Sequence, residues 1–184
     1  MKSKNILFFH LCTILAVVLL SFGCSQVAQL EIEPAASWQQ VADYAREHLP
    51  LEGRLLQKSD GFVYLKVDDA YIHRLFPMLD LQDEGFKEPP YFRSPEAPGA
   101  HISVFYADEH VRPIELGRHY TFALEDIEIV HPSPYTSYAI LQVKAPELEK
   151  LRQKYGLSPK LFGHEFHITL AKKTQHRQDR RQYD

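Results

Sequence analysis

The chain has 184 residues, of which 45% are hydrophobic and 24% are charged, and its formal net charge at pH 7 is -3. These values are ordinary for a globular protein, and the length suits one domain with a sizeable core. Tight binding of a long nucleic acid needs a strongly basic face, so the charge argues against that class of partner and leaves a small or short phosphate ester open.

The N-terminal residues have the pattern of an export signal. Two lysines precede an apolar run over residues 6–20, and the small residues Ser21 and Gly23 lead to Cys24. This order resembles a bacterial signal peptide, and the Gly-Cys pair resembles a lipoprotein site whose cysteine is acylated. We expect a signal over residues 1–24 and an exported, periplasmic or cell-envelope protein anchored in the membrane by a lipid on Cys24. A soluble secreted form and a retained membrane anchor are the alternatives.

The next residues predict a tether, a helix and a strand. Residues 25–36 suit a short tether, and Ser37 suits the N-cap of a helix whose apolar residues follow helical spacing to Leu49. Residues 53–60 are polar and turn-like. The run over residues 62–67 is rich in aromatic and branched side chains, which favours a strand.

A helix and an irregular segment come next. Asp68 can cap a helix that runs to about Leu79. Residues 80–99 contain four prolines, which is too many for regular structure, and loops of this length are often functional. Residues 101–106 then predict a strand, and residues 120–130 predict another strand or a bent pair of strands.

The same order of elements recurs in the second half. After a turn at residues 132–134, residues 137–144 predict a strand, Pro146 suits the start of a helix, Gly156 suits its end, and residues 166–171 predict a strand. Strand, helix, loop and strand therefore occur twice. This internal duplication suggests two similar lobes around a pseudo-twofold axis, with equivalent strands side by side at the centre.

Each repeat ends in a strand with a His-x-Ser/Thr pattern. Residues i and i+2 share one face of a strand, so His101 lies beside Ser103, and His167 lies beside Thr169. A twofold axis would bring the two motifs into one groove. There a neutral imidazole can take a proton from attacking water, a protonated imidazole can give one to the leaving oxygen, and the hydroxyls can donate to phosphate oxygens. This set predicts phosphodiester hydrolysis that requires no metal or cofactor.

The pattern alone is weak, because it occurs four times among the ten histidines, where random composition would give about one occurrence. The match at His131 lies in a proline-containing turn. The match at His119 starts an apparent strand, but no helix precedes it in the repeated order. The choice of His101 and His167 rests on the duplicated context and on the matching aliphatic flanks.

The tetrapeptides that start at His101 and His167 read His-Ile-Ser-Val and His-Ile-Thr-Leu. They resemble those of the 2H phosphoesterase superfamily, which includes RNA 2',3'-cyclic phosphodiesterases and enzymes that trim RNA 3' ends. The resemblance spans about residues 37–171. It implies a bilobal α+β fold, in which two pseudo-symmetric lobes with antiparallel-rich sheets line a central cleft and the helices lie outside. It also implies that the two histidines act as base and acid.

The leading hypothesis is a metal-independent phosphodiesterase that acts on a nucleotide or short RNA, at an RNA-end phosphodiester such as a 2',3'-cyclic phosphate. We expect a monomer with one domain over residues 37–172 and a charged, polar tail over residues 173–184. The alternative is a non-catalytic exported lipoprotein that binds a nucleotide or a protein partner in the equivalent cleft.

Further residues are weaker candidates for substrate binding. Tyr91, Phe92 and Arg93 in the proline-rich loop can stack on a base and touch a phosphate, or can fasten the loop to the core. Lys172 follows the second motif closely enough to reach an anionic ligand, or can be solvated. Tyr138 can line the groove, but it opens a strand, and we favour packing in the core.

Overall fold

The computed structural model describes residues 37–175. The strands are β1 (Glu52–Gln57), β2 (Val63–Lys66), β3 (His101–Phe105), β4 (His119–Thr121), β5 (Ala123–Ser133), β6 (Thr136–Lys144) and β7 (Phe166–Thr174). The helices are α2 (Trp38–His48), α3 (Ala70–His73), α4 (Leu75–Met78) and α5 (Pro146–Lys154). The expected signal over residues 1–24 with Cys24, the tether over residues 25–36 and residues 176–184 of the tail lie outside the described residues.

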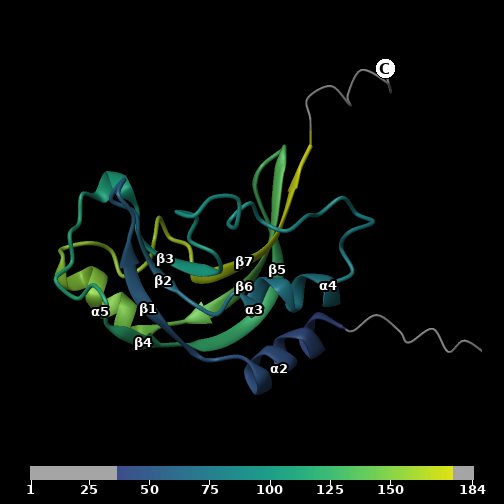
Figure 1. Cartoon of the computed structure of the whole chain (residues 1–184), viewed down its shortest axis with the longest axis horizontal. Coiled ribbons are helices and arrows are strands. Elements are labelled where there is room, and N and C mark those ends of the chain that lie inside the picture. The colour runs from purple at the N-terminus through teal and green to yellow at the C-terminus, as the bar shows by residue number, and fades with distance from the viewer. Residues whose placement is uncertain (1–36, 176–184) are drawn as a thin grey trace, which may run out of the picture. The chain divides into compact units, whose positions relative to one another are not determined.

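The seven strands of the described residues form one continuous sheet (Figure 1). Its order is β4-β1-β2-β3-β7-β6-β5, and neighbouring strands are antiparallel. The predicted α+β class with antiparallel-rich strands is therefore confirmed, and β3 and β7, which carry the two motifs, lie side by side. Two separate pseudo-symmetric lobes are not confirmed, because the strands of both repeats share one uninterrupted sheet.

One face of the central strands is core. Ile102 and Val104 in β3, and Ile168 and Leu170 in β7, are fully buried and belong to the same hydrophobic cluster as residues of α2, α3, α4 and α5. Successive side chains of a strand point to opposite faces, so the helices cover this side and leave the other side of β3 and β7 for a site. No helix within residues 37–175 has the length and apolar character needed to cross a membrane.

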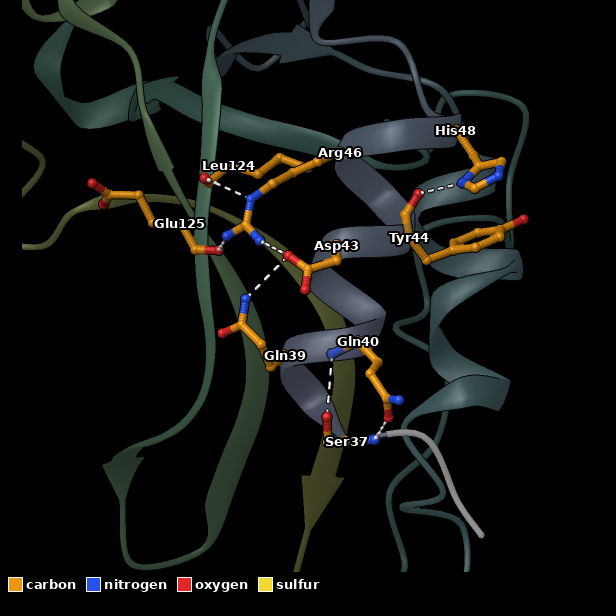
Figure 2. A network of polar contacts seen from close by, with 9 residues as sticks. All are labelled: Ser37, Gln39, Gln40, Asp43, Tyr44, Arg46, His48, Leu124 and Glu125. Atoms are coloured by element: carbon orange, nitrogen blue, oxygen red, sulfur yellow. Dashed lines mark hydrogen bonds and ion pairs between the residues drawn. The ribbon is translucent and has the colours of Figure 1, made fainter. Parts of the chain in front are cut away.

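Helix α2 begins at the predicted cap. The Gln40 amide donates to Ser37 Oγ at 3.3 Å, and the Ser37 amide donates to Gln40 Oε1 at 2.7 Å, which forms a capping box. At the other end, Arg46 donates to the backbone carbonyls of Leu124 at 3.4 Å and Glu125 at 2.6 Å (Figure 2). These contacts tie α2 to β5, an edge strand that is distant in the sheet order from the motif strand β3.

Strand β1 occupies most of the segment where the sequence predicts a polar turn over residues 53–60, so that prediction is wrong for residues 53–57 and holds for residues 58–60. Leu55 is fully buried, while Arg54 is exposed. A Cβ at Gly53 would overlap the Lys66 carbonyl of β2, so a glycine is needed for the two strands to approach. Polar residues on the exposed face and a glycine on the buried face gave this strand the composition of a turn.

The helix predicted from Asp68 to Leu79 is broken into α3 and α4 at Arg74. The N-cap position of α3 is Asp69, whose side chain makes no capping hydrogen bond, so the predicted cap at Asp68 is one residue early. Asp68 still supports the start of the helix, because its Oδ1 accepts a hydrogen bond from the Ala70 amide at 2.8 Å. Pro77 explains the break: it has no amide hydrogen, and its ring would clash with the carbonyl one turn earlier in a continuous helix. The apolar side of both short helices still packs into the core.

Strand β7 continues through Thr174, past the domain limit expected at residue 172. Thr174 pairs with Thr136 of β6, so the polar end of β7 is held by sheet hydrogen bonds. On its other side, Lys87 of the irregular loop over residues 80–99 exchanges two backbone hydrogen bonds with Lys172, of 2.9 and 2.8 Å. The proline-rich loop is thereby fastened along the strand that carries the second motif.

Candidate active site

The two motifs meet at the centre of the sheet, where Ile102 of β3 pairs with Ile168 of β7. Antiparallel pairing therefore sets each motif's histidine beside the other motif's hydroxyl residue. The four side chains are half-buried on the face opposite the helices: His101, Ser103, His167 and Thr169. Diagonal neighbours on adjacent strands lie about 7–8 Å apart, which leaves room for a phosphate between the two imidazoles.

A cleft of about 450 Å³ opens over this face, and all four motif side chains line it. Its other lining residues are Lys58, Phe62, Tyr91, Pro98, Tyr106 and Tyr138. The cleft thus combines two imidazoles and two hydroxyls with a cation and several aromatic rings. These are the groups that a phosphate attached to an aromatic base would contact.

Both imidazoles are held by the same local contact. His101 Nδ1 lies 2.7 Å from the carbonyl oxygen of Gly99, and His167 Nδ1 lies 3.0 Å from that of Glu165. A carbonyl only accepts, so each Nδ1 carries a hydrogen, and Nε2 is the nitrogen that can exchange a proton with a ligand. In both cases the carbonyl belongs to the residue two positions before the histidine, so the duplication extends to the orientation of the rings.

The turn that precedes His101 is fixed by a charged cluster. Asp69 Oδ1 accepts a hydrogen bond from the Ala100 amide at 2.8 Å and forms an ion pair with Lys66. Gly99 has a φ of 64°, and a Cβ there would overlap both Asp69 and Lys66. Glycine is the residue that fits this crowded, left-handed position, so Gly99 sets the turn whose carbonyl orients the His101 ring.

The surroundings of His101 favour its neutral form. Burial lowers the pKa of His101 to about 4, and the positive charges of Lys66, His167 and Lys58 act in the same direction. The hydrogen bond to the Gly99 carbonyl opposes this lowering in part. His101 is therefore unprotonated at neutral pH and can accept a proton at Nε2.

The surroundings of His167 include a carboxylate. Burial lowers the pKa of His167, and His164 adds to the lowering, but the Glu165 carbonyl and the negative charge of Glu128 both oppose it. Glu128 accepts a hydrogen bond of 2.6 Å from Gln142, which is paired with His167 across β6 and β7. The protonated form is therefore better supported at His167 than at His101.

Among the predicted loop residues, Tyr91 reaches the cleft and the other two do not line it. The Tyr91 ring centre lies 4.7 Å from that of His101, with the rings at 69°. Phe92 packs instead on His73, with ring centres 4.4 Å apart, and Arg93 is exposed. The loop turns after Tyr91, so consecutive side chains leave it in different directions.

Tyr138 lines the cleft, so its predicted place in the core is wrong. A shift in the β6-β7 register between Ala139 and Ile140 interrupts the simple alternation of side chains near Tyr138. Lys172 pairs with Tyr138, and its Nζ lies 5.6 Å from the Tyr138 ring centre. Lys172 thus contacts the cleft wall but is not itself a lining residue.

Lys58, Phe62 and Tyr106 line the cleft but were not predicted from the sequence. Tyr106 directly follows the first motif strand, and Phe62 directly precedes β2, so both sit at strand ends beside β3. For Tyr106, the position directly after a motif strand was a signal that the sequence contained. The pairing of Val63 with Phe105, which places Phe62 near Tyr106, has no counterpart in the local sequence pattern.

The competing motif matches lie at the two edges of the sheet. His119 is in β4, the edge strand beside β1, and His131 is in β5, the opposite edge strand. His131 Nδ1 lies 2.9 Å from Ser137 Oγ, outside the cleft. Within residues 37–175, no three or more His, Cys, Asp or Glu residues are grouped so that they could hold a metal ion.

One protein-family model matches more than half of the chain. Residues 63–177 match the family described as Swiss Army Knife, 2H phosphoesterase domain. The chain belongs to this family. No curated protein and no solved structure matches the chain. The matched part of this 2H phosphoesterase contains both motif strands and the proline-rich loop, and membership implies phosphoric diester hydrolysis as the general activity.

Proposed function

We propose that this 2H phosphoesterase hydrolyses the phosphodiester of a nucleotide or of an RNA end, such as a 2',3'-cyclic phosphate, by two-histidine acid-base catalysis. The observation that carries the proposal is the pair of imidazoles on adjacent strands, each held through Nδ1 and both lining one cleft. Family membership supports the class of reaction. The hydroxyls, the cation and the aromatic rings of the cleft support a phosphate that carries a nucleoside.

The proposed reaction proceeds by attack of water on phosphorus. His101 Nε2 takes a proton from the water as its oxygen bonds to phosphorus. The bond from phosphorus to the leaving oxygen breaks as His167 gives that oxygen its Nε2 proton. Ser103 and Thr169 donate hydrogen bonds to the non-bridging oxygens, and Lys58 adds positive charge where negative charge must be held. One water is consumed for each phosphodiester bond that is cleaved.

The charges around the rings support His101 as the base and His167 as the acid. Lys66 and Lys58 disfavour a proton on His101, whereas Glu128 favours a proton on His167. A phosphodiester anion bound between the rings would further stabilise the protonated imidazole. Burial lowers the pKa of both histidines, but neighbouring lysines lower it further at His101, whereas Glu128 opposes the lowering at His167. This difference favours His167 as the ring that carries the proton in a catalytic pair.

We expect kcat/KM to be greatest on the acid side of neutrality. The value of kcat/KM rises with pH as His101 loses its proton near pH 4. It falls again at higher pH as His167 loses its proton, and this limb lies below pH 6.5 because the pKa of His167 is lowered from the ordinary histidine value of about 6.5. Glu128→Gln removes an anion near His167, so it should move the alkaline limb to lower pH and leave the acidic limb in place. A pH series of kcat/KM for both proteins measures this, and an optimum above pH 7 would contradict the assignment.

The direct test is hydrolysis of a nucleoside 2',3'-cyclic monophosphate by the full chain in the presence of a metal chelator. Release of a nucleoside monophosphate at an unchanged rate after chelation supports the proposed mechanism. Loss of activity on chelation, with recovery on adding a divalent metal, counts against it. Binding of the nucleotide without turnover of any phosphodiester tested would instead favour the non-catalytic binding protein.

A further inference from the structure

Four aromatic rings form a continuous stack that starts beside His101 and leaves the cleft. Tyr64 and Phe62 have ring centres 5.6 Å apart and planes at 14°, and Phe62 and Tyr106 are 6.4 Å apart at 18°. Tyr106 then stacks on Phe162 at 5.5 Å and 21°. Nearly parallel rings at these separations are offset-stacked pairs. The stack thus connects the wall of the cleft to a ring outside it.

Phe162 is the outermost ring of the stack, and its side chain is exposed to solvent. It is 73% exposed, and its φ of 43° is in the left-handed region, where a bulky residue is an outlier. The loop is fastened by buried Leu161, whose carbonyl accepts a hydrogen bond of 2.7 Å from the His164 amide. Exposure of the ring and a strained backbone both cost free energy, and strain of this kind is characteristic of ligand-binding positions.

The cleft has aromatic rings at both ends. Antiparallel pairing places Tyr106, just after β3, at the end of the cleft where β7 begins, on the side of His167. Tyr138 pairs with Lys172 near the other end of β7, and Tyr91 contacts His101 on that side. A phosphate between the histidines would therefore have aromatic rings in both directions along the strands.

We propose that Phe162, backed by Tyr106, is a stacking platform for a second nucleobase, so that the preferred substrate carries a nucleoside on each side of the scissile phosphodiester. This deepens the proposed function and rests on it. With Tyr106 against one face of Phe162, most of the exposed area belongs to the other face and the edge. Every base has a π-face, so the platform would accept bases with little sequence preference.

The charges fit a short substrate. Lys58 is the cation among the cleft-lining residues, and Lys160, near the platform, is already paired with Glu165. A long polyanion would need more positive charge along its path. A single exposed ring is also small for a protein or membrane contact, which needs a contiguous apolar area of several hundred Å². A dinucleotide or short oligonucleotide matches the observed groups.

The test compares a 3'-5'-linked dinucleoside monophosphate with a nucleoside 2',3'-cyclic monophosphate, using the full chain and measuring both Kd and kcat/KM. Phe162→Ala should weaken binding of the dinucleotide roughly 5- to 150-fold, the range that loss of one base stack predicts, and should leave the cyclic mononucleotide unchanged. Phe162→Trp should retain dinucleotide binding. Phe92→Ala, another exposed ring but away from the cleft, should affect neither ligand.

Equal losses for both ligands, or no loss for either, would overturn the platform. Tighter mononucleotide binding by Phe162→Ala would also overturn the platform. That result would mean that the Phe162 ring blocks access of a base to the Tyr106 ring rather than adding a second stacking surface. If wild-type protein binds the dinucleotide but turns over neither ligand, the proposed function fails while the Kd comparison still tests the platform. If wild-type protein binds neither ligand, the platform is refuted as well.

Discussion

His101→Ala and His167→Ala are each expected to lower kcat for a phosphodiester by about 10²–10⁴-fold, the usual contribution of a positioned general acid or base. Both rings line the same cleft and would act on one phosphorus atom, so the double variant should lose little more than the more damaged single variant. Initial rates at saturating 2',3'-cyclic nucleotide measure the effect.

His119→Ala is the matched control. It removes a histidine from the same His-x-Thr pattern, but from the edge strand β4, and should leave kcat unchanged. His101 contacts the rings of Tyr91 and Phe62, so His101→Gln, which keeps more of the side-chain volume, and thermal unfolding of each variant separate catalysis from packing. Full activity in both alanine variants would remove the basis of the catalytic assignment.

Arg152 is expected to be the charged residue whose loss costs the most stability. Its side chain, in α5, is 2% exposed, and it donates to the Val104 carbonyl of β3 at 2.6 Å and to the Ser158 carbonyl at 2.8 Å. It also binds both carboxylate oxygens of Glu109, at 3.0 and 2.7 Å. Burial raises the pKa of Glu109, but the hydrogen bonds from Arg152 and the Tyr106 amide outweigh it, and the pKa lies below its ordinary value.

Arg152→Met should lower the free energy of unfolding by about 3–5 kcal/mol, because it leaves the Glu109 carboxylate and two backbone carbonyls without their partner. Urea or thermal unfolding measures the change. The Arg152–Glu109 pair also supports the end of β3 and the start of the segment at Tyr106. Neither Arg152 nor Glu109 lines the cleft, so we expect activity to fall near the unfolding transition rather than at all temperatures.

Asp43→Ala provides the comparison, since Asp43 forms an exposed ion pair of 2.5 Å with Arg46 on α2 (Figure 2). Exposed pairs of this kind contribute about 0–1 kcal/mol. An Arg152→Met variant as stable as Asp43→Ala would show that the buried pair is not needed to hold α5 on β3.

Elements with local signals were predicted well. The Ser37 cap, the start of α5 at Pro146 and its end near Gly156, where φ is 76°, depend on residues a few positions apart. The motif strands were predicted for the same reason, because the alternation of polar and apolar side chains along a strand can be read from residues next to one another. The error at β1 came from a local pattern whose meaning depended on a packing partner, the neighbouring strand β2. The break in the helix at residues 70–78 had a local signal, Pro77, which the prediction of one continuous helix did not use.

The amino-acid sequence was sufficient to place His101 with Ser103 and His167 with Thr169, because residues two apart in a strand share a face whatever surrounds them. The tertiary structure decided that β3 pairs with β7, that both rings line one cleft and that Phe162 stacks on Tyr106. These contacts join residues far apart in the chain. They depend on strand order and register, which are set by the packing of the whole sheet against its helices rather than by any local periodicity.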